Sequence, residues 1–389
     1  MSQGQMTRVI VSIDGCHPFD GARHLGDLSA QRYIWDMMKK QILLTGASGE
    51  VGFEAFKELL RREDHYKIRI LSLDHPVERK LFKPYLDQVD IVWGDLRNPD
   101  DVRQAVAGVD AVLHIAALIP PLADHQPELA WQVNVGGTRS LLAAMQAQNP
   151  APRLIYTSSI SVYGDRLANP DIRVGDPLIP SDGDEYAKTK IEAEQLIQNS
   201  SLQWTILRLC GILTKNLKIQ PLMFHMPLNT ALEWCHACDA GYALVQALEN
   251  DFVCGEIFNL GGGKQCRVSA REFIEEVLPL YGLERSVLPE HAFAIQNFHS
   301  GNYIDGDELE HLLKFRRKTL IDYYDTASLR VSPVQRFLVG RIPKAIVRNY
   351  LARISEPLKS IRENNARLIE RYYGSRQIFE KLVRGEGVS

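Results

Sequence analysis

Cysteines, long apolar runs and low-complexity segments are scarce or missing in this sequence, and each absence excludes a class of protein. The 389 residues include only six scattered cysteines, too few for a disulfide framework. The longest uncharged apolar stretch, residues 111–123, contains His114 and two prolines and is too short to span a bilayer. The apolar run at residues 9–13 ends at Asp14, so it does not resemble a secretory signal. A cytoplasmic location with reduced thiols is therefore expected.

Net charge is also small, which removes any general reason to expect nucleic acid as a partner. The formal charge is -3, with 45% hydrophobic and 24% charged residues, as in an ordinary globular protein. Residues 331–389 are the exception. They hold twelve Lys or Arg, five Glu and no Asp, a net charge of +7, so the rest of the chain carries -10. This basic segment needs its own explanation.

Short apolar runs alternate with helical patterns from residue 41 onward. This alternation predicts an α/β fold, a doubly wound parallel Rossmann sheet covered on both faces. The expected strands are 42–45, 68–73, 89–93, 111–115, 154–158 and 205–209. The expected helices are 54–62, 100–106, 128–148 and 185–198. A capping box at Ser269–Glu272 predicts another helix that ends near residue 280.

A glycine-rich turn joins the first expected strand to the first helix. The glycines at 46, 49 and 52 have the spacing GxxGxxG. The first permits a tight turn, the second lets the backbone approach a pyrophosphate, and the third lets helix and strand pack closely. The helix N-terminus adds N–H donors and the positive end of its dipole. The predicted dinucleotide-binding residues here are Gly46, Ser48, Gly49, Glu50, Val51 and Gly52.

Asp74 lies at the end of the second expected strand, 22 residues after Gly52. A carboxylate at this place binds the adenosine ribose hydroxyls. Because it also repels a 2′-phosphate, the expected cofactor is NAD, and NADP is disfavoured.

Further motifs follow in order, and together they make residues 41–330 resemble the extended short-chain dehydrogenase/reductase family, the NAD-dependent epimerase/dehydratase group. Asp95-Leu96 is similar to the family's adenine-contacting pair, and His114-Ile115-Ala116-Ala117 is similar to a motif that lies along the cofactor. The resemblance therefore adds Asp95, Leu96, Ile115, Ala116 and Ala117 to the expected NAD site.

The catalytic motifs of that family also have counterparts. Residues 157–164 are similar to its catalytic-serine strand end, with Ser159 in the catalytic place, and Tyr186 and Lys190 form the YxxxK motif. Asn134 matches the family's helix asparagine, which the resemblance implies shapes its helix and supports a proton relay. A free phenol has a pKa of roughly 10, so Tyr186 needs the nearby Lys190 ammonium and a positive nicotinamide to act as a base near neutral pH. Tyr186 and Lys190 are also expected to contact the cofactor.

Three departures from the family pattern bear on the substrate. The acid pair of the family's dehydratases is missing, because Ser158-Ser159-Ile160 stands at the catalytic strand end. Gly211 replaces an asparagine that contacts the sugar nucleotide, and residues 231–239 lack an arginine that meets the diphosphate. These differences favour a small-molecule alcohol or ketone over a nucleotide sugar.

Cys235 and Cys238 form a CxxC pair, but structural zinc needs four ligands and no second pair exists. We interpret them as packed cysteines and expect no metal site. The tail is predicted to contain amphipathic helices, with one face formed by Ile346, Tyr350 and Ile354. A second expected helix, ending at Gly374, has a face formed by Leu358, Ile361, Leu368 and Tyr372. We expect the tail to dock on the acidic body or on a second copy, in preference to an anionic membrane surface.

The sequence thus predicts four parts. They are an N-terminal extension (1–40), an NAD-binding Rossmann core (41–210), a substrate-binding part (211–330) and a basic helical tail (331–389). Residues 1–36 of the extension are expected to be an optional, partly disordered addition or a partly ordered arm. The predicted activity is NAD-dependent hydride transfer at a secondary alcohol or ketone, with Tyr186 as acid/base. A sugar-nucleotide 4-epimerase and a non-catalytic NAD-binding sensor or scaffold are the alternatives. A homodimer is also expected.

Overall fold

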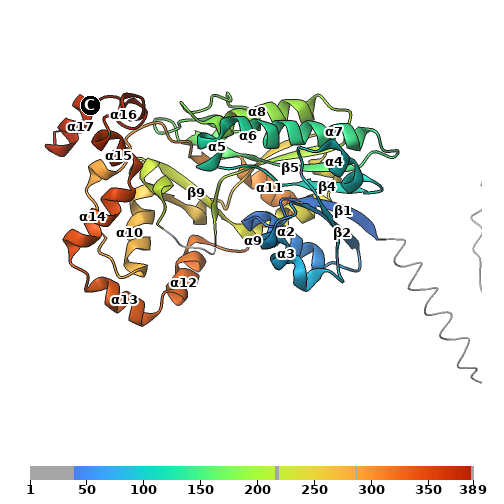
Figure 1. Cartoon of the computed structure of the whole chain (residues 1–389), viewed down its shortest axis with the longest axis horizontal. Helices are drawn as coiled ribbons and strands as arrows, with labels where there is room; N and C mark the ends of the chain where they lie inside the picture. The colour runs from blue at the N-terminus through green and yellow to red at the C-terminus, as the bar shows by residue number, and fades with distance from the viewer. Residues whose placement is uncertain (1–38, 215–218, 286, 387–389) are drawn as a thin grey trace, which may run out of the picture. The chain divides into compact units, whose positions relative to one another are not determined.

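A seven-stranded sheet forms the centre of the protein (Figure 1). The structure, a computed structural model, describes residues 39–214, 219–285 and 287–386; the expected extension, apart from its last two residues, lies outside this range. The strand order is β10-β7-β5-β4-β1-β2-β3, and every neighbouring pair is parallel. The strands are β1 (Lys40–Thr45), β2 (Tyr66–Ser72), β3 (Asp90–Trp93), β4 (Ala111–His114), β5 (Arg153–Ser159), β7 (Trp204–Leu209) and β10 (Ile257–Leu260). The predicted doubly wound parallel sheet is confirmed.

Helices cover both faces of this sheet because successive residues of each strand point to opposite sides. In β1, Ile42 and Leu44 join one buried cluster, which includes Phe56, whereas Leu43 joins another, which includes Leu141. The helices are α2 (Glu50–Leu60), α3 (Pro76–Phe82), α4 (Pro99–Val106), α5 (Leu122–His125), α7 (Gly137–Gln146), α8 (Glu185–Gln198), α9 (Ala237–Ala247) and α11 (Gly306–Leu313).

The expected helix over 128–148 is interrupted in the structure. It consists of α6 (Pro127–Ala130), a π-helical turn η2 (Trp131–Gly136) and α7. The adjacent glycines 136 and 137 have low helix propensity, and apolar periodicity alone does not reveal a change from α to π geometry. Such turns often occur at functional sites, and this one carries Asn134.

Smaller elements complete the fold, most of them after β7. A three-stranded sheet contains β8 (Gly211–Leu213), β9 (Ala231–His236) and β11 (Arg267–Ser269), and a two-stranded one pairs β6 (Asp171–Ile172) with β12 (Asn302–Tyr303). The helix α10 (Ala270–Leu280) begins with the predicted capping box of Ser269 and Glu272. The 3-10 turns are η1 (Lys83–Tyr85), η3 (Ile160–Tyr163), η4 (Pro221–His225), η5 (Asp251–Val253), η6 (Lys264–Cys266) and η7 (Glu290–Ala292).

The tail is helical, as predicted, but its packed face differs from the expected one. After α12 (Leu320–Arg330), the chain forms α13 (Pro333–Gly340), α14 (Lys344–Ile354), α15 (Glu356–Arg362), α16 (Ala366–Tyr373) and α17 (Arg376–Val383). Ile346 and Tyr350 are 58% and 64% exposed, whereas Val347 and Leu351 are buried against α10 residues. Of the predicted face, Ile354 packs against the same cluster as Val347 and Leu351, whereas Ile346 and Tyr350 stay exposed. The helix has two adjacent apolar stripes, and tertiary packing selects between them.

The predicted second helix of the tail is in fact two. Leu358 and Ile361 belong to α15, and Leu368 and Tyr372 belong to α16. Gly374, with a φ of +73°, ends α16 as expected.

Candidate active site

The glycine turn after β1 has the geometry of a phosphate-binding loop. Gly46 has a φ of +74°, and a Cβ on it would lie 2.6 Å from the backbone N of Ala116. A Cβ on Gly52 would lie 1.9 Å from the Gly46 carbonyl oxygen. The N-cap residue of α2 is Gly49, and no side chain caps the helix there. The backbone N–H groups of its first turn are therefore not used by a capping side chain. This cradle fits a pyrophosphate bound at the helix N-terminus.

Replacing Gly52 by alanine tests this cradle. The added methyl group would force the loop away from α2, and we expect a loss of about 1–3 kcal/mol in the free energy of unfolding together with weakened NAD binding. Urea unfolding and NADH fluorescence titration measure the two effects. Gly108→Ala is the control for alanine substitution, because no atom lies within 4 Å of its Cβ position; its positive φ can lower stability, but NADH binding should not change. Equal NADH affinity in Gly52→Ala and the wild type would contradict the cradle.

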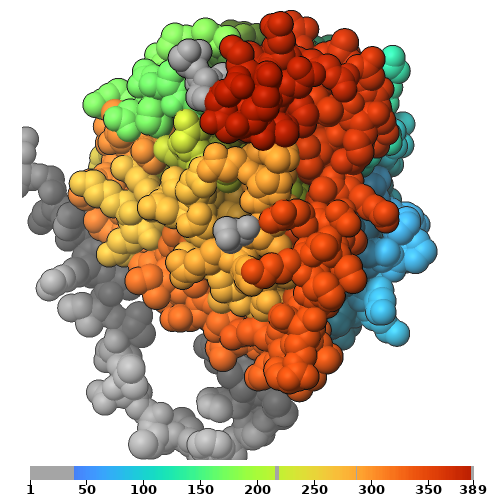
Figure 2. Space-filling model, turned by 90° about the vertical axis from the view of Figure 1, so that its left-hand side faces the viewer, coloured from blue at the N-terminus to red at the C-terminus, as the bar shows by residue number. Residues whose placement is uncertain are grey.

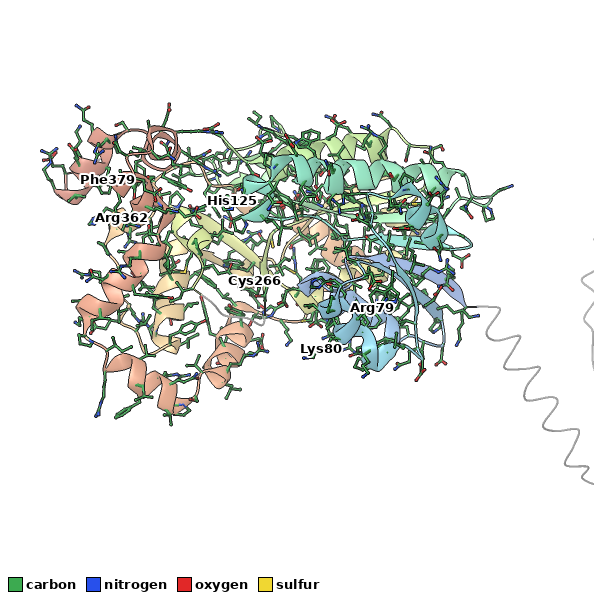
Figure 3. The ribbon with its side chains drawn as sticks, in the orientation of Figure 1. Arg79, Lys80, His125, Cys266, Arg362 and Phe379 are labelled. Carbon is green, nitrogen blue, oxygen red and sulfur yellow. The ribbon has the colours of Figure 1, made fainter. Side chains whose placement is uncertain are left out.

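The expected ribose-binding acid, Asp74, follows β2 at the same edge of the sheet. Arg79 of α3 (Figure 3) donates from Nε and Nη2 to its two carboxylate oxygens, at 2.5 and 2.9 Å. This pairing lowers the pKa of Asp74. The Arg79 guanidinium also lies 4.7 Å from the centre of the Trp93 ring. The carboxylate is therefore held at this edge by a cation that sequence spacing did not predict.

Asp95 and Leu96 follow β3. Asp95 accepts from the backbone N and the guanidinium of Arg97, which lowers the pKa of Asp95. Leu96 packs against Gly137, whose Cβ would lie 3.1 Å from the Leu96 Cβ. The motif of Ile115, Ala116 and Ala117 continues β4 and faces the glycine turn, because the Ala116 N–H donates to the Thr45 hydroxyl at 3.3 Å. These segments all lie at the carboxyl ends of β1–β4, where ligands bind in open parallel sheets.

A buried polar network runs beneath that edge. The ring nitrogens of His114 lie 2.8 Å from the Thr45 hydroxyl and 3.0 Å from the Thr138 hydroxyl. Burial, with a smaller contribution from Lys190, lowers the pKa of His114 to about 3, so the ring is neutral. The Thr138 hydroxyl in turn donates to the Asn134 carbonyl. The network thus connects the strand that leads into the glycine turn with the π-helical turn.

Asn134 extends this network to α8. Its Oδ1 accepts from Leu118 N at 2.7 Å, and its Nδ2 donates to Leu118 O and to the Thr189 hydroxyl at 3.0 and 2.9 Å. The Thr189 hydroxyl then donates to the Tyr186 carbonyl. Asn134 therefore fixes the backbone around Tyr186, and Thr189 is a positioning residue that motif spacing did not identify.

Ser159, Tyr186 and Lys190 lie together where β5 ends and α8 begins. The side chains of Ser159 and Tyr186 form a hydrogen bond. Lys190 Nζ donates to the Thr157 carbonyl at 2.7 Å and lies 5.7 Å from the centre of the Tyr186 ring. Tyr186 and Lys190 are four residues apart and share one face of α8.

Burial dominates the proton affinities in this cluster. It raises the pKa of Tyr186, and the hydrogen bond from Ser159 partly offsets this. Burial also lowers the pKa of Lys190 to about 7, although Glu194 opposes the shift. The protein alone therefore keeps Tyr186 protonated, and a cation beside the phenol would be needed to lower its pKa.

Asp184 caps α8 and is another residue that motif spacing missed. Its Oδ1 accepts from Ala187 N at 2.9 Å, and its Oδ2 lies 2.7 Å from His299 Nδ1. A Cβ on the neighbouring Gly183 would lie 3.3 Å from Nη1 of Arg371 in the tail. The tail thus reaches the N-terminal end of the helix that carries Tyr186.

Gly211, a departure from the family pattern, and Asp239, the acid at the end of the stretch that lacks the arginine, both have structural explanations. A Cβ on Gly211 would lie 2.8 Å from the Trp234 ring, which packs on Phe273, so the indole occupies the space that an asparagine side chain would need. Asp239 accepts from the backbone N of Arg317 and Lys318 and thereby holds that loop. Neither position offers a group to a nucleotide.

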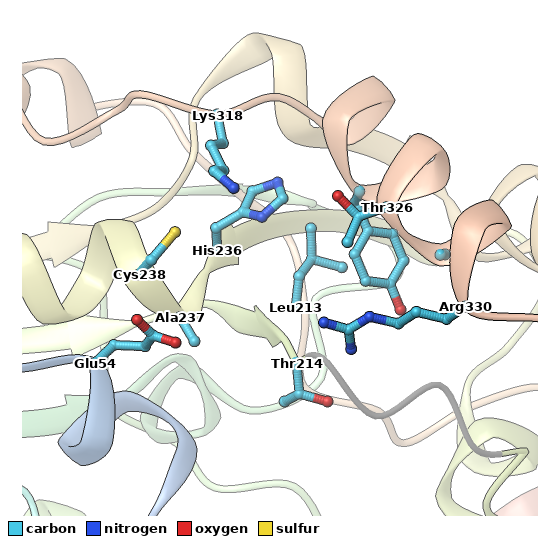
Figure 4. Close-up of a pocket in the computed structure, with 11 residues that line it drawn as sticks. Glu54, Leu213, Thr214, His236, Ala237, Cys238, Lys318, Thr326 and Arg330 are labelled. Carbon is cyan, nitrogen blue, oxygen red and sulfur yellow. The ribbon is translucent and has the colours of Figure 1, made fainter. Parts of the chain in front are cut away.

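A small cavity of about 70 Å³ lies beside β8, β9 and α12 (Figure 4). Its lining includes Thr214, His236, Cys238, Lys318 and Arg330. His236 donates from Nε2 to the Thr319 carbonyl at 2.8 Å, so it also has a structural role. The cavity contains none of the predicted catalytic residues.

Cys235 of the CxxC pair is buried and Cys238 is partly buried. Among the described residues, no group of three or more His, Cys, Asp or Glu side chains is arranged to hold a metal ion.

Comparisons with known proteins match part of this chain. A model of the 3-beta hydroxysteroid dehydrogenase/isomerase family matches residues 43–212. An undecaprenyl-diphosphate-linked N-acetylglucosamine 4-epimerase of Escherichia coli O157:H7 is 33% identical over 167 residues, 41% of this chain and 44% of that protein. A 3-beta-hydroxysteroid dehydrogenase of Mycolicibacterium neoaurum is 34% identical over 165 residues, 40% and 42% of the two chains. The chain thus matches less than half the length of these curated relatives.

Solved structures show the same fold over a longer span. UDP-glucuronic acid 4-epimerase of Bacillus cereus has a TM-score of 0.61 at 19% identity and covers 75% of this chain and 98% of its own. The dTDP-glucose 4,6-dehydratase DesIV of Streptomyces venezuelae has a TM-score of 0.62 at 21% identity and covers 74% and 95%.

Proposed function

We propose that this chain is a member of the extended short-chain dehydrogenase/reductase family, which it resembles, and that it catalyses NAD-dependent hydride transfer at a secondary alcohol or ketone. The observation that carries the proposal is the cluster of Ser159, Tyr186 and Lys190 at the edge of the sheet where the glycine cradle also opens. Bound NAD would supply the hydride acceptor or donor. The named relatives, an epimerase and a steroid dehydrogenase, support this reaction class.

In the proposed mechanism, Tyr186 Oη moves the proton of the substrate hydroxyl or carbonyl oxygen. Ser159 hydrogen-bonds Tyr186 and would bind the same substrate oxygen. Lys190 is fixed by the Thr157 carbonyl; its ammonium, when charged, would favour the phenolate and bind the nicotinamide ribose. Asn134 and Thr189 hold the Tyr186 backbone, so the phenol keeps its direction as the proton moves.

The substrate class proposed is a small alcohol or ketone that is not a nucleotide sugar. The packing of the Trp234 ring against Gly211 supports this substrate class. A sugar-nucleotide 4-epimerase of this family would have a substrate-contacting asparagine at the position of Gly211. The test is incubation with NAD and a panel of secondary alcohols, including sterols. Stoichiometric NADH formation supports a dehydrogenase, whereas tightly retained NAD(H) that is not consumed favours the epimerase. NAD binding without turnover of any substrate favours the sensor. The predicted homodimer and cytoplasmic location remain part of this proposal.

Asp74 is proposed to select NAD over NADP. In Asp74→Ser the adenosine ribose loses a charged hydrogen-bond acceptor. Arg79 loses its ion-pair partner, so its guanidinium can bind a 2′-phosphate. Hydrogen bonds to charged groups contribute about 1.5–3 kcal/mol, so we expect NAD affinity to fall by roughly 10- to 100-fold and NADP affinity to rise. Titration with both cofactors measures the ratio. Asp100→Asn removes another exposed Asp–Arg pair, with Arg103, and should leave the ratio unchanged. An unchanged preference in Asp74→Ser would contradict this role.

A further inference from the structure

Exposed apolar side chains gather at the end of α12 and on the first tail helices. Between 42% and 86% of each of these side chains is exposed, and the helices that carry them form much of the face seen in Figure 2. We call this set the outer tail face: Leu329, Val334, Phe337, Leu338, Ile342, Ile346 and Tyr350. Soluble monomers rarely expose so many large apolar residues in one continuous segment, and such surfaces usually mark an interaction site.

The helix α13 exposes its apolar side chains, unlike an ordinary surface helix. None of its residues is buried, and Val334, Phe337 and Leu338 are all exposed. Its contact with the body is polar instead, because Arg336 donates from Nε to the Leu280 carbonyl at 3.1 Å and from Nη2 to the Ser328 carbonyl. A helix normally buries its apolar stripe and exposes its arginines. The contacts of Arg336 therefore orient α13 with its apolar side chains toward solvent.

Next to it, α14 has apolar residues on two sides. Val347 and Leu351 pack in the cluster that contains Ile274 and Leu278 of α10. Ile346 and Tyr350 remain exposed. The inner stripe is enough to hold α14 on the body, so the outer stripe is available for another contact.

The positive charge of this segment points to an anionic partner. Residues 326–355 contain six Lys or Arg and no Asp or Glu, and of these Lys344 pairs with Glu284 at 2.8 Å. The Arg341 guanidinium lies 4.0 Å from the centre of the Phe337 ring, so a cation and an aromatic ring stand together at the exposed turn. Aromatic and aliphatic side chains flanked by cations are the composition of helices that lie on anionic lipid surfaces.

A second copy of the chain fits this face less well. In a symmetric dimer the same patch meets itself, so cations of one copy would face cations of the other. An anionic bilayer complements both the apolar side chains and the cations. In the described part of the chain, no helix is long and apolar enough to cross a membrane. We propose that the outer tail face binds the surface of anionic membranes, with α13 and the start of α14 in the interface.

Vesicle flotation tests this proposal with the full chain. Vesicles of phosphatidylcholine alone are compared with vesicles of phosphatidylcholine and phosphatidylglycerol in equal amounts. We expect the protein to float with the anionic vesicles and to remain unbound with the neutral ones, and high salt should weaken the binding. The double variant Phe337→Ser/Leu338→Ser should bind at least about tenfold more weakly, because two apolar anchors are lost.

Two matched controls separate this face from general effects. Phe252 is 81% exposed on η5, so Phe252→Ser removes an exposed aromatic ring elsewhere and should bind like the wild type. Arg341→Gln should weaken binding to anionic vesicles, whereas Arg103→Gln should not; Lys344 is left unchanged because it pairs with Glu284. All variants should bind NADH equally, which shows that they are folded and keeps this test independent of the proposed activity.

Three results would overturn the proposal. The first is wild-type protein that does not float with anionic vesicles. The second is a double variant that floats as well as the wild type. The third is sedimentation that shows a dimer lost in Phe337→Ser/Leu338→Ser, without vesicle binding, because the face would then bind a second copy.

Discussion

Replacing Tyr186 by phenylalanine is expected to lower kcat by about 10²–10⁴-fold, the usual contribution of a positioned acid/base. The change removes only the phenol oxygen, and the ring can keep its place on α8. Ser159 loses its hydrogen-bond partner, while the backbone bonds from Thr189 and Asp184 remain. NADH binding should therefore persist. The measurement is NADH turnover with an alcohol that the wild type oxidises, together with NADH titration.

The structure supplies a matched control for this variant. Tyr85 packs edge-on against Phe56 and takes no part in the site, so Tyr85→Phe should keep wild-type turnover. A raised kcat at high pH in the wild type that Tyr186→Phe lacks would identify the phenol as the titrating group, because burial raises the pKa of Tyr186. Full turnover by Tyr186→Phe would refute the assignment.

Much of the core could be predicted because its signals are local. The buried parallel strands appear as short apolar runs, and the capping box at Ser269 and Glu272 fixed the start of α10 to the residue. The glycine turn could be predicted from the spacing of its glycines alone. The close approach of Gly52 to Gly46 is a property of the strand–turn–helix unit itself.

Features that depend on tertiary contacts could not be predicted in this way. The partner of Asp74 lies on the next helix, and Trp234 reaches Gly211 from a neighbouring strand. In α14 the sequence allows two apolar stripes, and packing on α10 selects Val347 and Leu351. The π-helical turn around Asn134 has no periodic signature. The role of the tail at Asp184 is likewise visible only in the fold.

The second large effect is expected at a buried ion pair beneath the site. Arg208 of β7 donates from Nε and Nη2 to the Glu194 carboxylate of α8, at 3.0 and 2.7 Å. The two side chains are only 3% and 0% exposed. Removing one partner of a buried pair costs about 3–5 kcal/mol, because the other charge stays buried without compensation. Arg208→Met should lose this much in the free energy of unfolding, measured by urea denaturation.

Arg208 has further partners, which sharpen the test. Its Nη1 donates to the Tyr163 hydroxyl at 2.7 Å and to the Val174 carbonyl at 3.0 Å. Arg208 thus holds β7, η3 and α8 together. The control is Asp251→Asn, which disrupts the ion pair between Arg153 and the exposed Asp251 carboxylate. It should lower the free energy of unfolding by no more than about 1 kcal/mol.

The double variant Arg208→Met/Glu194→Leu separates the pair from its surroundings. It leaves neither charge of the pair buried without its partner, so it should lose less stability than Arg208→Met alone. Glu194 also opposes the fall in the pKa of Lys190. Its removal should therefore lower the pKa of Lys190 further and reduce turnover even where the fold is intact. If instead Arg208→Met is as stable as the wild type, the pair does not hold α8 on the sheet, and Glu194 would act only through its charge near Lys190.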